Sequence, residues 1–142
     1  MIFLIVQFAT LICVAQKEIV YKFDQSVIDS LQRGVDKYSA LFKKPANELK
    51  LYILLIEEAD SYNLYLQEYS SIPQSGFLQT ISASNRKIKL SDKSLIPVLY
   101  PSDVLSEQIQ KDKIARLPYS GYYLKVVTEN YKQRVSEVAF LF

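Results

Sequence analysis

The chain has 142 residues, one cysteine and no histidine, and 17 basic and 15 acidic side chains give it a formal net charge of +2. This length suits one domain with an adequate core, and the nearly neutral balance argues against nucleic acid or an anionic membrane as a partner. The lack of histidine and of glycine-rich phosphate loops removes the usual transition-metal ligands, histidine-based catalytic triads and nucleotide motifs. We therefore expect no metal and no organic cofactor.

Residues 1–15 (MIFLIVQFATLICVA) form an apolar stretch before the first charged side chain, Lys17. About 7 to 15 apolar residues are typical of a secretory signal, whereas a membrane span needs roughly 20. Cys13 and Ala15 place small side chains where a signal peptidase requires them, which predicts cleavage after Ala15. The expectation is a signal peptide followed by a single α+β domain over 16–142, secreted or periplasmic, with no membrane span and no cysteine left.

Two other interpretations of this stretch stay open. It has no basic residue at its start, so it also fits an apolar first strand of a cytosolic domain. It also fits a lipoprotein signal in which Cys13 carries the lipid, although that pattern requires a small residue where Ile12 stands.

A short strand and a long helix are expected at the start of the domain. Apolar and polar side chains alternate over 17–23, as in a half-buried strand. Over 27–42 apolar side chains recur every three or four residues, the spacing of one helix face. Ser26 and Asp29 fit a capping box at its start, and Pro45 ends it.

Residues 49–70 allow two interpretations. The run 49–56 is apolar on both faces if extended, and 62–69 alternates leucine with polar side chains, so the two fit a hairpin that turns at 58–61. The apolar positions of both runs also fit helical spacing. We favour the hairpin.

A loop and a second hairpin are expected next. Residues 70–76 contain proline, glycine and serine and are typical of a loop. The runs 86–90 and 95–100 flank a turn at 91–94. Pro97 lies in the second run, which predicts an edge strand or a bulge, because proline cannot donate to the ladder.

The last third of the chain predicts a short helix and a final hairpin. Ser102 or Asp103 can cap the helix, and Pro118 closes its segment. Side chains alternate over 122–127, and 135–142 forms the second strand.

This order of elements predicts an α+β fold with one long N-terminal helix packed on an antiparallel sheet of about five to six strands. Cystatin-like and nuclear-transport-factor-like domains have this element order. No residue motif carries the likeness, and a fold does not fix a function.

Acidic residues offer one possible chemistry. Glu57, Glu58 and Asp60 cluster beside the apolar run 49–56, and paired carboxylates can serve as acid and base in hydrolysis. A solvated turn explains the same residues without any activity. A small cell-envelope hydrolase is therefore the alternative function.

Tyrosine is the unusual feature, with 11 copies and no tryptophan. Tyrosine buries a large apolar body while its hydroxyl stays hydrated, so it is common at recognition surfaces, although it is also an ordinary strand residue. We predict a non-enzymatic exported binding or protein-interaction domain with an unknown protein or small molecule as its ligand. The candidate binding residues are Tyr65, Tyr69, Tyr122 and Tyr123.

The period of a strand assigns these rings to faces. Tyr65 and Tyr69 would be exposed with the polar side chains of 63 and 67, whereas Tyr62 would join the core. Tyr122 and Tyr123 must point to opposite faces, so only one of them can line a given surface.

Overall fold

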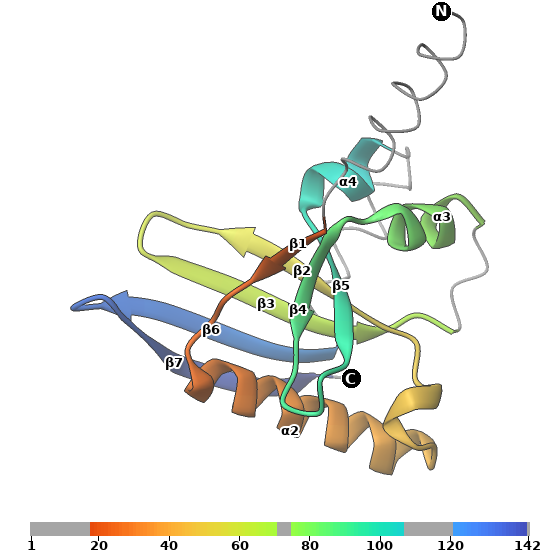
Figure 1. Cartoon of the computed structure of the whole chain (residues 1–142), viewed down its shortest axis with the longest axis horizontal. Helices are drawn as coiled ribbons and strands as arrows, with labels where there is room; N and C mark the ends of the chain where they lie inside the picture. The colour runs from red at the N-terminus through yellow and green to blue at the C-terminus, as the bar shows by residue number, and fades with distance from the viewer. Residues whose placement is uncertain (1–17, 71–74, 107–120, 142) are drawn as a thin grey trace, which may run out of the picture.

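The computed structural model describes residues 18–70, 75–106 and 121–141, shown in colour in Figure 1. The predicted signal peptide, part of the predicted loop at 70–76 and most of the segment that Pro118 was expected to close lie outside these ranges. No helix within them is long and apolar enough to cross a membrane.

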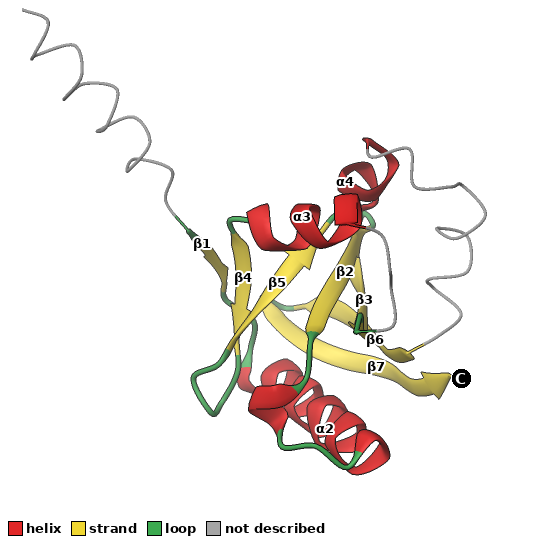
Figure 2. Ribbon diagram, turned by 90° about the vertical axis from the view of Figure 1, so that its right-hand side faces the viewer, coloured by secondary structure: helices red, strands yellow, loops and turns green. Residues whose placement is uncertain are grey.

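The fold is α+β, with helices on both sides of one sheet (Figure 2). Helix α2 (Gln25–Phe42) packs on one face, and the short helices α3 (Ser75–Ala83) and α4 (Pro101–Ser106) lie on the opposite side. The strands are β1 (Ile19–Tyr21), β2 (Leu51–Glu57), β3 (Ser61–Glu68), β4 (Arg86–Lys89), β5 (Leu95–Leu99), β6 (Gly121–Glu129) and β7 (Lys132–Leu141), and the 3-10 helix η1 (Ala46–Glu48) precedes β2.

The sheet has seven strands in the order β1-β4-β5-β2-β3-β6-β7 and is mixed. The hairpins β2–β3, β4–β5 and β6–β7 are antiparallel, but β1 runs parallel to β4 and β2 runs parallel to β5. The prediction of an antiparallel sheet with five to six strands was therefore wrong in strand number and direction. Local patterns identify hairpins, whereas the joining of one hairpin to the next depends on contacts far apart in sequence.

The predicted apolar helix face is confirmed, but the capping box is wrong. Helix α2 begins at Gln25 after Asp24, and no side chain caps it. The carboxylate of Asp24 instead accepts the backbone N–H of Gln133 in β7, at 2.7 Å, and the Gln133 side chain accepts the Asp24 N–H, also at 2.7 Å. These bonds fasten the start of the helix to the edge of the sheet.

The hairpin predicted for 49–70 is confirmed, since β2 and β3 pair antiparallel from Leu51 opposite Glu68 to Glu57 opposite Tyr62. The prediction from Pro97 was wrong, because β5 lies inside the sheet between β4 and β2. Pro97 pairs with β4, and the register with β2 begins one residue later, so the proline does not interrupt that ladder.

Candidate functional site

Six side chains on the face opposite α2 form the candidate site, which we call the tyrosine face. They are Tyr52 from β2, Asn63, Tyr65 and Gln67 from β3, Tyr69 just beyond β3, and Tyr123 from β6. Side chains alternate along a strand, so Leu64 and Leu66 of β3 point toward α2, whereas the six residues of the tyrosine face point away from it. The pairing register then sets them side by side: Tyr52 lies opposite Gln67.

The pair of Tyr65 and Tyr123 lies at the centre of this face. The two residues are directly opposite each other in β3 and β6, and their ring centroids lie 4.8 Å apart with a 30° angle between the planes. Both rings are half-buried. Aromatic pairs at such a separation contribute about 0.5–1.5 kcal/mol beyond the area they bury.

A chain of hydrogen bonds fixes the Tyr123 ring. Its hydroxyl donates to Oδ1 of Asn63 at 2.8 Å, and Nδ2 of Asn63 donates to Oε1 of Glu58 at 2.7 Å. Burial, and to a smaller extent the neighbouring Tyr65, Glu137 and Glu58, raise the pKa of Tyr123 to about 12. The hydroxyl therefore keeps its proton at neutral pH and remains a donor to Asn63.

Tyr52 anchors the other end of the tyrosine face. Its side chain is fully buried and its hydroxyl donates to Oε1 of Gln67 at 2.7 Å. It packs with Ile81 of α3, and its ring lies 6.1 Å from that of Tyr69. Burial raises the pKa of Tyr52, so it too stays protonated. Helix α3 thus packs over this end of the face and holds its aromatic groups in place.

The row next to Tyr65 and Tyr123 is polar and charged. Asn63 pairs with Lys125 in β6, and Lys125 pairs with Glu137 in β7. Paired residues of an antiparallel ladder lie on the same face, so an amide, a cation and an anion follow one another across three strands. The tyrosine face is therefore bordered by polar and charged side chains that can form hydrogen bonds and ion pairs.

The structure brings three of the four predicted binding residues onto one face. Tyr65, Tyr69 and Tyr123 lie together, whereas Tyr122 is 1 % exposed beneath α2 on the opposite face. Its ring fits over Gly34, where an added Cβ would lie 2.4 Å from a ring carbon. The predicted opposition of Tyr122 and Tyr123 is confirmed, and a binding role for the four tyrosines stays a prediction.

The face assignment of Tyr62 holds, whereas the expected exposure of Tyr65 and Tyr69 needs correction. Tyr62 lies on the core side, as predicted. Tyr65 and Tyr69 were expected to be exposed, but both are half-buried against the cluster around Tyr52. The sequence did not single out Tyr52, because the run 49–56 is apolar on both faces. Its position opposite Gln67 follows once the hairpin turn is placed at 58–60.

The carboxylates of the alternative function lie in or beside the exposed β2–β3 turn. Glu57 accepts a hydrogen bond from the hydroxyl of Tyr100, and Glu58 accepts bonds from Ser61 and Asn63. These partners are neutral donors, and no described contact sets two of the carboxylates against each other across a pocket. Within the described ranges, no group of three or more acidic, cysteine or histidine residues could hold a metal ion.

Comparison with known proteins adds no assignment: no protein-family model matches the chain, and no significant match was found among curated proteins or solved structures.

Proposed function

We propose that the protein is a non-enzymatic binding domain that uses its tyrosine face to contact a protein partner. The observation that carries the proposal is the close pair of tilted rings of Tyr65 and Tyr123, which is half-exposed and in which the Tyr123 hydroxyl is held by Asn63. Tyrosine is enriched at the centre of protein interfaces, where its ring buries a large area and its hydroxyl bonds to polar groups.

Prior ordering of the rings favours binding. Association costs about 0.5–1.5 kcal/mol for each flexible side chain that it immobilises. Asn63 holds the hydroxyl of Tyr123 in the free protein, so this ring is already largely immobilised before binding. Rigid aromatic side chains flanked by adaptable polar ones are also the composition of binding surfaces in antibodies.

A protein is the partner that fits the extent of the surface. The aromatic pair and the polar row of Asn63, Lys125 and Glu137 extend over β3, β6 and β7. Such a spread suits a flat, mixed interface better than a small molecule, which is usually enclosed by a cavity.

We also propose that the protein is exported. Residues 1–15 have the length and small-residue pattern of a secretory signal, so the binding domain would work in the periplasm or outside the cell. Mass spectrometry of protein from its native host tests this part. A chain that begins near Gln16 supports export, whereas an intact Met1 or a lipid on Cys13 contradicts it.

Photo-crosslinking in the native host tests the surface. Benzoylphenylalanine is placed at Tyr65 or Tyr123, and at Ala40 as a control that is exposed on α2, away from the tyrosine face. We expect one discrete protein adduct from positions 65 and 123 and none from position 40. Adducts at position 40 alone, or at no position, would refute the proposal.

A further inference from the structure

A second candidate site lies on the α2 side of the sheet, away from the tyrosine face. A pocket of about 490 Å³ opens between α2, η1 and the turn that joins β4 to β5. This volume is within the range of about 300–1,000 Å³ typical of small-molecule sites. Its floor is made of buried aliphatic side chains: Val35, Leu51, Leu90 and Ile96.

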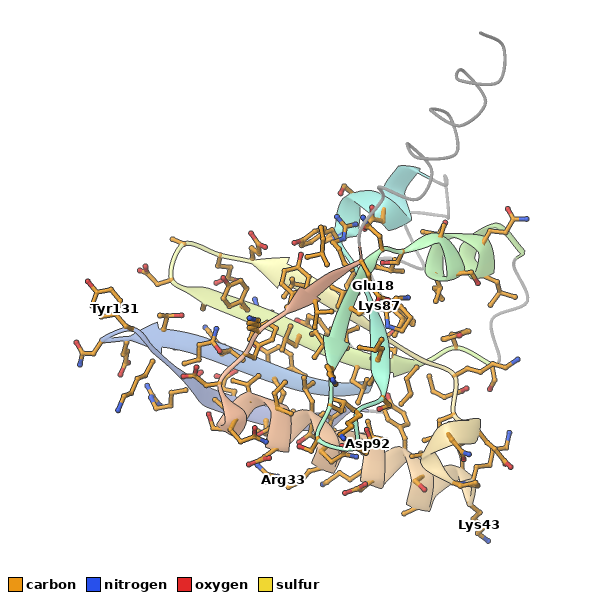
Figure 3. The ribbon with its side chains drawn as sticks, in the orientation of Figure 1. Glu18, Arg33, Lys43, Lys87, Asp92 and Tyr131 are labelled. Carbon is orange, nitrogen blue, oxygen red and sulfur yellow. The ribbon has the colours of Figure 1, made fainter. Side chains whose placement is uncertain are left out.

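The rim of this pocket is polar. Asn47 of η1 lies on one side, and Asp92, Lys93 and Ser94 of the β4–β5 turn lie on the other. Figure 3 shows Asp92 on this turn, close to α2. An apolar floor with a few polar groups at the mouth suits a ligand that has an apolar body and one polar end.

We propose that this pocket binds a small amphipathic carboxylate, with its apolar body on the aliphatic floor and its carboxylate at the ammonium group of Lys93. This inference goes beyond the proposed protein contact and does not depend on it.

The two charged side chains at the rim indicate whether the polar end of the ligand is an anion or a cation. The carboxylate of Asp92 already accepts the backbone N–H of Ser94 at 2.9 Å and its hydroxyl at 2.5 Å. These bonds lower the pKa of Asp92 and give its ionised carboxylate hydrogen-bond donors within the turn. Lys93, in contrast, forms no ion pair with any described residue. The ammonium group of Lys93 is therefore the charged group at the rim that can pair with an anionic ligand.

The tight turn between β4 and β5 fixes the backbone of Lys93. Its φ is 69°, in the left-handed region that glycine adopts at lower cost. Its N–H donates to the carbonyl of Leu90, and the Leu90 N–H donates to the carbonyl of Ser94, which closes a short loop that usually has glycine at this position. This turn holds the backbone of Lys93 at the mouth of the pocket.

Three probes of equal chain length distinguish an anionic from a neutral or a cationic polar end: octanoate, 1-octanol and octylamine. Each is titrated into the ¹⁵N-labelled full-length protein, and binding is followed through the amide resonances. We expect octanoate to bind at least about fivefold more tightly than 1-octanol, and octylamine to bind most weakly, with shifts concentrated at Val35, Leu90 and Ile96. Equal affinity for octanoate and octanol, preference for octylamine, or shifts confined to other residues would overturn the proposal.

Two variants locate the site. Lys93→Gln should reduce the affinity for octanoate to that for 1-octanol and leave the octanol affinity unchanged. Ala46→Trp should fill the pocket and abolish binding of both probes, whereas Ala40→Trp, the same change on the exposed surface of α2, should not. Thermal unfolding of each variant confirms that it is folded. Octanoate binding that survives Lys93→Gln undiminished would overturn the proposal even if Ala46→Trp failed to fold.

Discussion

Replacing Tyr131 by glycine should stabilise the protein. The β6–β7 hairpin turns through Asn130 and Tyr131, with Glu129 paired to Lys132, and both turn residues have positive φ, 51° and 63°. Two-residue turns of this type favour asparagine followed by glycine. Figure 3 shows Tyr131 at the tip of the hairpin, and its side chain is fully exposed.

The size of the effect follows from two opposing terms. A residue other than glycine pays about 1–2 kcal/mol in the left-handed region. Glycine loses about 0.5–1 kcal/mol more backbone entropy on folding. Because the exposed ring of Tyr131 contributes almost nothing to the core, Tyr131→Gly should raise the free energy of unfolding by roughly 0.5–1 kcal/mol and the Tm by about 2–4 °C.

Tyr131→Ala is the matched control, because it removes the ring but keeps the backbone strain. Its free energy of unfolding should stay within about 0.5 kcal/mol of wild type, the usual range for exposed substitutions. Urea and thermal unfolding followed by circular dichroism measure both variants. A Tyr131→Gly protein less stable than wild type, or equal stabilisation by alanine and glycine, would refute the reasoning.

Three further predictions concern the core and the tyrosines. Leu31→Ala should lower the free energy of unfolding by about 2–5 kcal/mol because Leu31 is fully buried, whereas Asp36→Ala on the exposed side of the same helix should change it by less than about 0.5 kcal/mol in urea unfolding. Gly34→Ala should cost about 1–3 kcal/mol in the same assay, although alanine normally favours a helix, because its methyl group would collide with the ring of Tyr122; a stabilised variant would show that the packing is looser. The raised pKa of Tyr123 means that the unfolded chain loses this proton first, so the contribution of Tyr123 to stability should be constant below about pH 9 and fall from about pH 10 to 12. In Tyr123→Phe the alkaline fall in stability should be smaller, and an identical fall would contradict the assignment.

Local patterns were enough to predict the elements that the chain forms with near neighbours. The spacing of apolar residues predicted α2 and its buried face, and alternation predicted the β2–β3 hairpin and the opposite faces of Tyr122 and Tyr123. Each of these depends on a period within one segment. Helix α3 was not predicted, because its sequence (SGFLQTISA) contains several weak helix formers and its stability depends on Ile81 packing against the sheet.

The arrangement of the sheet and the exposure of the site depend on distant segments. The parallel pairs β1–β4 and β2–β5 join strands that are separated by helices, and no local pattern specifies them. Tyr69 appeared exposed from its polar neighbours, but it packs on the cluster that contains Tyr52 and Ile81. The tyrosine face could therefore be anticipated in part from β3 and β6, but its buried end could not.

The affinity of the crosslinked partner, once it is purified, is the most direct test of the binding surface. Wild type, Tyr65→Ala and Tyr131→Ala are titrated with this partner at a temperature where circular dichroism shows all three to be folded. A ring at the centre of an interface typically contributes more than 1 kcal/mol, so Tyr65→Ala should weaken binding about tenfold, while loss of the exposed ring of Tyr131 at the hairpin tip should change it by less than about twofold. Equal affinities for all three proteins would contradict the proposal that the tyrosine face binds the partner.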